Sequence, residues 1–142
     1  MTEALKLQAK DADGVAVMSA ILQDAILVVR DMRYDAAARA FMLAFSRFRW
    51  ETAVGSVFER VNCALTVQGV DQVQTTELDQ TRKDDLHELL ALALEANTLR
   101  FVFAGGAQLR LHLNGWQLRL EDFGAPWPTE KCPSHELKRG AQ

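Results

Sequence analysis

Alternation of apolar and polar positions is the main pattern of the chain, and it predicts a protein built largely from β-strands. The clearest example is residues 60–68, where every second residue is apolar and most of the others are polar. A strand of this kind buries one face on a core and exposes the other, as in an antiparallel sheet. Residues 98–103 and 108–113 predict two more strands, joined by a turn at Gly105 and Gly106.

Two segments in the first half of the chain, 26–34 and 41–50, are rich in β-branched and aromatic residues. The polar and small residues 35–39 separate them, which predicts an antiparallel hairpin. A short alternating segment around Lys6 predicts a first strand. Residues 71–85 are mostly polar and show no period, so they predict a surface loop.

A helix is predicted after the first strand. Asp11 is a suitable N-cap, because its carboxylate can accept a hydrogen bond from a free N–H of the first turn. The apolar residues that follow recur with helical spacing and predict one buried face: Val17, Met18, Ile21, Leu22 and Ala25.

Leu86–Glu95 fits two interpretations. Leucine, alanine and glutamate favour a helix, whereas Leu90, Leu92 and Leu94 alternate with alanines as in a strand. We favour the strand, and the helix remains open.

Residues 113–123 also fit two structures. The Asn-Gly dipeptide at positions 114 and 115 is typical of a type I′ turn and predicts a hairpin. Trp116, Leu120 and Phe123 instead fit the spacing of a helix that the asparagine would cap. The local sequence does not decide between a hairpin arm and a helix.

The chain has 142 residues, of which 49% are hydrophobic and 25% are charged, as is usual for a globular domain. We therefore predict a single domain at 1–128, followed by a polar tail at 129–142. Sixteen basic and 19 acidic residues give a net charge of −3, which does not favour binding to nucleic acid or to an anionic membrane.

Features of localisation point to the cytoplasm. No apolar run approaches the length of a signal peptide or of a membrane span. Cys63 and Cys132 show no CxxC spacing, so we expect reduced, unpaired thiols.

The histidines show no spacing typical of a metal or catalytic site. His87 and His135 each precede a glutamate, but the residues four positions beyond them are Ala91 and Arg139, so the HExxH pattern of zinc proteases is absent. We therefore expect neither a metal nor another cofactor, and we name no catalytic residue.

Arg47, Arg49 and Trp50 are the candidate ligand-binding residues. On a strand, Arg47 and Arg49 would share one face about 7 Å apart and could together bind an anion. Phe48 and Trp50 would share the other face. A structural interpretation, which we favour, places these two rings in the core and pairs both arginines with nearby acids.

Several short segments together resemble a known family. They are 5–9, 22–25 (LQDA), 47–51 (RFRWE), 58–61 (FERV), 103–106 (FAGG) and 120–127 (LEDFGAPW). The chain resembles the bacterial family known as domain of unknown function 2948. The resemblance implies a bacterial, cytoplasmic domain with a helix where this chain has Asn114, and it carries no established activity.

The predicted fold class is α+β. We expect a first strand, a helix, a mainly antiparallel sheet of about six further strands, and a C-terminal capping helix. The sheet should be strongly curved or form a partial barrel, similar to pleckstrin-homology-like folds.

The predicted function is that of a non-catalytic binding or accessory module for a protein or small-molecule partner. One alternative is a small enzyme whose carboxylate, arginine and histidine side chains converge from separate strands. Another alternative is a structural homo-oligomer. The sequence alone does not identify a ligand.

Overall fold

The computed structural model of the chain describes residues 4–52 and 58–129, which contain one α-helix and seven β-strands. The elements are β1 (Lys6–Ala9), α1 (Ala12–Ile21), β2 (Ile26–Asp35), β3 (Ala40–Phe48), β4 (Phe58–Thr76), β5 (Leu86–Glu95), β6 (Thr98–Phe103) and β7 (Gln108–Thr129). Two 3₁₀ turns, η1 (Trp50–Thr52) and η2 (Ala104–Gly106), follow β3 and β6.

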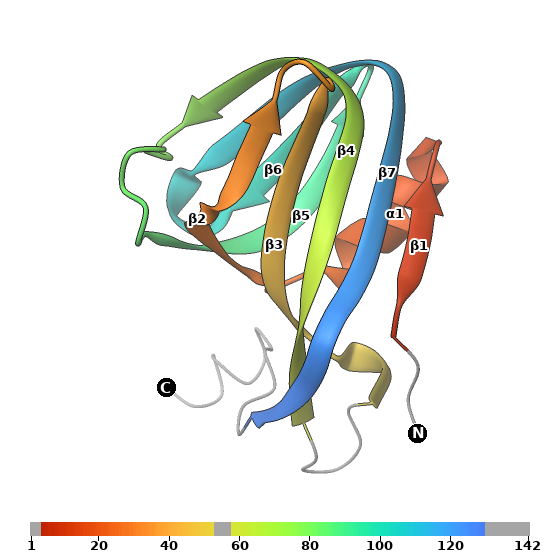
Figure 1. Cartoon of the computed structure of the whole chain (residues 1–142), viewed down its shortest axis with the longest axis vertical. Helices are drawn as coiled ribbons and strands as arrows, with labels where there is room; N and C mark the ends of the chain where they lie inside the picture. Colours follow the sequence, from red (N-terminus) through yellow and green to blue (C-terminus); the bar gives the residue numbers. More distant parts are fainter. Residues whose placement is uncertain (1–3, 53–57, 130–142) are drawn as a thin grey trace.

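The strands form one antiparallel sheet that curves back on itself. Their order is β1-β7-β4-β3-β2-β5-β6, and β6 also pairs with β7, so the pairings form a ring. Figure 1 shows β3, β4 and β7 in front of β5 and β6. The predicted curved, mainly antiparallel sheet is confirmed, as are the hairpin of β2 with β3 and the strand at Leu86–Glu95.

The core lies between the two layers of the ring. Phe41, Phe45 and Leu65 face it from β3 and β4, and Phe101 and Leu111 face it from β6 and β7. Each of these side chains is at most 1% exposed. The alternation that predicted the strands therefore also selects the residues that fill the inside of the ring.

Helix α1 packs against β5 and β1. Its N-cap is confirmed, because the backbone N–H of Gly14 donates to Oδ1 of Asp11 at 2.8 Å. The predicted buried face is partly wrong: Met18 is buried, but Val17 is 52% exposed. The hydroxyl of Ser19 accepts a hydrogen bond from the backbone N–H of Leu92 at 2.9 Å, so this polar side chain faces β5.

The two longest strands, β4 and β7, bend together at Gly69. Gln68 pairs with Gln117, and Val70 pairs with Leu113, so one residue of β4 lies opposite three residues of β7. Gly69 has a φ of +87°, and a Cβ there would lie 2.8 Å from the backbone oxygens of both Asn114 and Gly115. The Asn-Gly dipeptide therefore forms an irregularity within a continuous strand.

The predicted C-terminal helix is wrong, and so is the alternative of a type I′ hairpin turn at Asn114. Residues 113–123 belong to β7, where Leu118 and Leu120 are fully buried and pair with β4. The helical spacing predicts that Phe123 is buried. The structure shows instead that this side chain is 47% exposed. Pairing with a long neighbouring strand overrides the local preference.

The ends of two other predicted segments also change. The loop predicted at 71–85 begins later, because β4 continues to Thr76. Of the polar tail predicted at 129–142, all but Thr129 lies outside the described residues. Within 4–52 and 58–129, no helix is long and apolar enough to cross a membrane.

Replacing Gly69 by alanine tests the bend. We expect Gly69→Ala to lower the free energy of unfolding by about 3 kcal/mol, because a strained φ and a clash with backbone add together. Gly105→Ala is the matched control, since Gly105 has a φ of +81° but nothing within 4 Å of its Cβ position. It should cost about 1 kcal/mol. Equal losses in urea denaturation would show that the close approach at Gly69 does not limit stability.

Candidate functional site

Arg47 ends the inward-facing row of β3. Leu43 and Phe45 precede it on the same face of the strand, and Val61 lies opposite it on β4. The side chain of Arg47 is only 1% exposed, so its guanidinium lies at the edge of the core. A buried charge at such a position needs a full set of hydrogen-bond partners.

The guanidinium of Arg47 has these partners. Its Nε and Nη2 donate to Oδ1 and Oδ2 of Asp122, both at 2.8 Å. Its Nη1 and Nη2 donate to Oε1 and Oε2 of Glu51, at 3.1 and 2.7 Å. Nη1 also donates to the backbone oxygen of Phe48 at 3.2 Å. These bonds use every N–H group that an arginine side chain offers.

Asp122 connects this arginine to the start of the chain. Its Oδ2 accepts from the backbone N–H of Leu5 at 3.0 Å, and its own N–H donates to the oxygen of Leu5 at 2.9 Å. Its side chain is 4% exposed. The cluster of Arg47, Asp122 and Glu51, here called the Arg47 cluster, therefore joins β3, β7, η1 and the residues before β1.

The ionisation of the cluster follows from its burial and pairing. Burial by itself would lower the pKa of Arg47, but the hydrogen bonds and charges of Asp122 and Glu51 raise it above its ordinary value. The hydrogen bond from Arg47 lowers the pKa of Glu51, against the opposing effect of burial. Cys63 pairs with Asp122 across the strands, and burial raises the pKa of its thiol to about 12. The thiol is therefore protonated at neutral pH and a poor nucleophile.

Arg49 and Trp50 lie beside the Arg47 cluster. Arg49 forms an ion pair with Glu59, and its backbone N–H donates to the oxygen of Glu59 at 2.9 Å. Trp50 packs edge-on against Phe48, with ring centroids 4.6 Å apart. The structure thus brings the three candidate residues together with both arginines buried against acids. The structural interpretation expected these ion pairs and a buried Phe48, whereas Trp50, which it also placed in the core, is only partly buried and lies in η1.

The two described histidines, His87 and His112, have different surroundings. His87 packs against Phe103 with ring centroids 5.6 Å apart. Nε2 of His112 lies 2.8 Å from Oε1 of Gln74. His135 and Cys132 are outside the described residues. Within the described ranges, no three His, Cys, Asp or Glu side chains are arranged to hold a metal ion.

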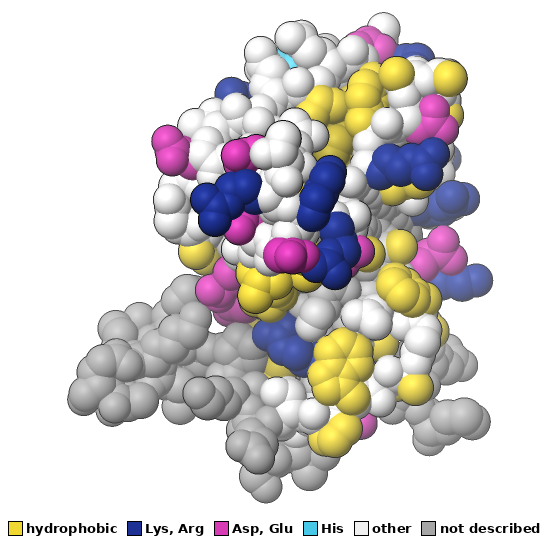
Figure 2. All heavy atoms as spheres, turned by 60° about the vertical axis from the view of Figure 1, so that its left-hand side comes forward, with side chains coloured by type: hydrophobic (Ala, Val, Ile, Leu, Met, Phe, Trp, Pro, Cys, Tyr) yellow, Lys and Arg dark blue, Asp and Glu magenta, His cyan; other side chains and the backbone are white. Residues whose placement is uncertain are grey.

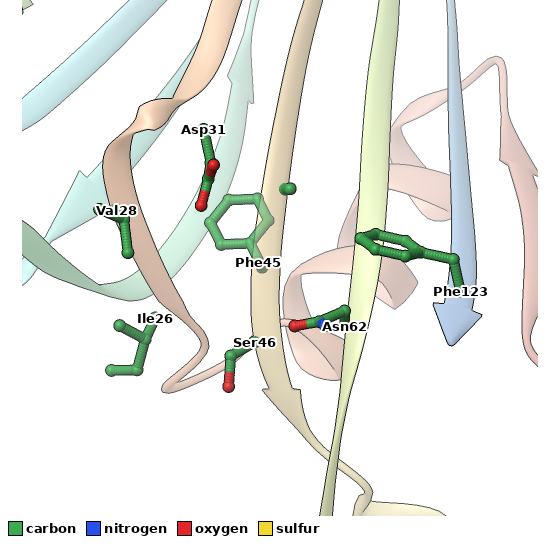
Figure 3. A pocket seen from close by; sticks show the side chains of 8 residues that line it. Ile26, Val28, Asp31, Phe45, Ser46, Asn62 and Phe123 are labelled. Atoms are coloured by element: carbon green, nitrogen blue, oxygen red, sulfur yellow. The ribbon is translucent and has the colours of Figure 1, made fainter. Parts of the chain in front are cut away.

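A cavity of about 330 Å³ lies where β2 leaves β3. Leu27 pairs with Phe45 and Met32 pairs with Leu43, so four residues of β2 face the single residue Ala44 of β3. Figure 3 shows β2 bowing away from β3 in this region. The described residues that line the cavity are Ile26, Val28, Asp31, Ala44, Phe45, Ser46, Asn62 and Phe123.

The loop between β4 and β5 binds the part of β2 that does not pair with β3. The backbone N–H groups of Val29 and Arg30 donate to the oxygens of Asp85 and Lys83, each at 3.0 Å. The side chain of Arg30 forms an ion pair with Asp84. Part of β2 therefore forms backbone hydrogen bonds with this loop instead of with β3. We call the space that opens between the two strands the β2 cavity.

Sequence reasoning missed the β2 cavity. The sequence pattern predicts only a strand at Ile26 and Val28, and the spacing of Phe123 fits a helix. The bulge depends on hydrogen bonds between segments more than fifty residues apart, which local patterns do not contain. The one local signal is the charged pair Arg30 and Asp31, which follows four consecutive apolar residues of the strand.

The face that carries β2 is chemically mixed. Figure 2 shows its exposed hydrophobic side chains in separate groups, with basic and acidic side chains between them. A second hollow, of about 420 Å³, is open and mainly polar, and is formed by Thr75, Glu77, Leu78, Asp79, Arg82 and Asp85. Neither hollow has a histidine among its lining residues.

Removing the guanidinium tests the Arg47 cluster. We expect Arg47→Met to lower the free energy of unfolding by about 3–5 kcal/mol, because Asp122 would stay buried without its cation. Combining it with Asp122→Asn should recover part of the loss. Arg30→Met, which breaks an exposed pair, should cost about 1 kcal/mol or less. Equal effects of the two arginine substitutions in urea denaturation would contradict a structural role for the cluster.

Acid should weaken the contribution of Glu51. A carboxylate with a lowered pKa in the folded state stabilises the fold above its unfolded pKa, and this contribution disappears as the pH falls through the folded value. The difference in unfolding free energy between wild type and Glu51→Gln should therefore shrink between about pH 6 and pH 3. Glu51 is 42% exposed, so we expect no more than about 1 kcal/mol. A pH-independent difference would contradict the ion pair.

Comparison with known proteins agrees with the resemblance found in the sequence. No curated protein matches the chain. The family described as "Protein of unknown function (DUF2948)" matches residues 5–135, which include all the strands and the helix described above. The chain therefore belongs to the DUF2948 family of uncharacterised proteins.

Proposed function

We propose that this protein is a non-catalytic binding module of a bacterial cytoplasmic pathway, with the β2 cavity as its ligand site. The observation that carries the proposal is the composition of the cavity wall. Ile26, Val28 and Phe123 provide apolar surface, and Asp31, Ser46 and Asn62 provide polar groups. Ligand sites commonly combine a mainly apolar lining with a few polar groups that orient the ligand.

The size of the cavity supports a small ligand. About 330 Å³ is near the lower end of the volumes typical of ligand pockets, roughly 300–1,000 Å³. The ring of Phe123 is 47% exposed, although it lies beside Asn62 in the middle of the paired strands. In Figure 3 this ring points from β7 across β4 toward β3. An apolar ligand would cover surface that is now in contact with water.

The frame around the cavity supports a fixed site. Ala44 and Ser46 belong to β3, which pairs with β4 over its whole length. The Arg47 cluster holds the end of β3 from the opposite face of the sheet. A site built on paired strands keeps its geometry better than a site built on loops.

Other parts of the proposal rest on coarser support. The curved antiparallel sheet supports a likeness to pleckstrin-homology-like folds, although β7 runs where their capping helix was expected. The net charge of −3 supports a small-molecule or protein partner over nucleic acid or an anionic membrane. Assembly into a homo-oligomer remains a prediction, which sedimentation equilibrium would test.

Filling the cavity should prevent binding. We expect 2-phenylethanol, used as a neutral probe, to shift the amide NMR signals of the lining residues in a saturable way. Ala44→Leu should weaken this binding at least about tenfold, because the larger side chain occupies the cavity. The matched control is Ala64→Leu, since Ala64 is the cross-strand partner of Ala44 but does not line the cavity. Equal weakening by both variants, or shifts confined to other residues, would contradict the proposed site.

A further inference from the structure

We propose that the β2 cavity selects organic cations, that is, ligands with an ammonium group on an apolar body. This inference rests on the proposed function, because it names the ligand class of the same site. It follows from the charges in and around the cavity, from the exposed aromatic ring, and from the hydrogen-bonding groups on the cavity wall.

The lining of the cavity carries a negative charge. Among the described residues that line the cavity, Asp31 is the only ionisable one. Its backbone lies in the part of β2 that bows away from β3. In Figure 3 its carboxylate points into the space between the two strands, beside Phe45. A carboxylate at this place attracts a cation and repels an anion.

The guanidinium of Arg60 lies beside the cavity, at Ser46. Nη1 of Arg60 donates to the backbone oxygen of Ser46 at 2.8 Å and lies 3.3 Å from its hydroxyl oxygen, and Nη2 lies 3.5 Å from the oxygen of Asp24. Burial lowers the pKa of Arg60, and the carboxylates of Asp24 and Glu88 oppose this shift. The charge of Arg60 therefore acts together with two carboxylates, and Arg60 is not among the residues that line the cavity.

Part of the cavity wall is aromatic. Phe123 is 47% exposed and is the half-exposed ring of the cavity. The face of an aromatic ring carries partial negative charge and attracts ammonium groups. The same ring packs against an apolar ligand body. The hydroxyl of Ser46 and the amide of Asn62 add hydrogen-bonding groups for the polar end of a ligand.

Arg33 provides a second test of the attraction between a bound cation and Asp31. It follows Asp31 by two positions on β2 and pairs with Met42, so it lies on the same side of the strand region but does not line the cavity. Its positive charge opposes the attraction of a cation to Asp31. Removing this charge should therefore strengthen cation binding, whereas removing the charge of Asp31 should weaken it.

Three probes with similar bodies test the inference: 2-phenylethylamine, 2-phenylethanol and 3-phenylpropanoate. We expect the amine to bind at least about tenfold more tightly than the alcohol, and the carboxylate to bind most weakly, in amide NMR titrations of the full chain near neutral pH. Asp31→Asn should weaken binding of the amine at least about tenfold more than binding of the alcohol, and so remove the preference for the amine. Arg33→Gln should increase the affinity for the amine.

The outcomes separate the two proposals. If the amine and the alcohol bind the cavity equally in the wild type, selection of cations is overturned while the cavity remains the ligand site. The same conclusion follows if Asp31→Asn leaves the preference intact. If none of the probes shifts the signals of the lining residues, the proposed function and the ligand class fail together.

Discussion

The contact between β4 and β7 at Gly69 determines how the sheet closes. On one side of this contact, β7 pairs with β4 and β1, and on the other side it pairs with β4 and β6. One strand thus takes part in both layers, which is possible only because it bends without losing its partner. The bend requires a residue without a side chain, since a Cβ at Gly69 would lie 2.8 Å from two backbone oxygens. This closure encloses the core, and it sets which face of β3 points outward and how β5 is presented to α1.

The Arg47 cluster compensates the buried charge of Arg47 at the edge of the core. The inward row of β3 ends in a charged residue, and the low-polarity surroundings make an unpaired charge there very unfavourable. Two carboxylates and one backbone oxygen satisfy the whole guanidinium, and Asp122 extends the network to Leu5. Replacing such a cluster by apolar residues is often neutral for stability, so its value lies in fixing which segments meet. It holds the end of β3, and with it the floor of the β2 cavity, in one position.

The strands could be predicted from the sequence because their alternation reports burial directly, as residues 60–68 show. The C-terminal helix could not be corrected in the same way. Trp116, Leu120 and Phe123 have helical spacing, and only the pairing of Leu118 and Leu120 with a distant strand makes the segment extended. The candidate residues Arg47 and Arg49 were found by their local density of charge and aromatic rings. Their carboxylate partners Asp122 and Glu59 lie on other strands, and no local pattern identifies such pairs.

The β2 cavity interrupts the simplest pairing that β2 and β3 could form. A regular hairpin would let β2 and β3 pair without interruption, yet four residues of β2 oppose one residue of β3. The interruption is compensated by Val29 and Arg30, whose backbone N–H groups bond to the β4–β5 loop, so the departure is supported by a second segment. The cavity lining includes the half-exposed ring of Phe123 and the carboxylate of Asp31, and neither residue belongs to the core. A compensated departure from the simplest pairing is common at functional sites, so this feature supports the ligand site proposed above.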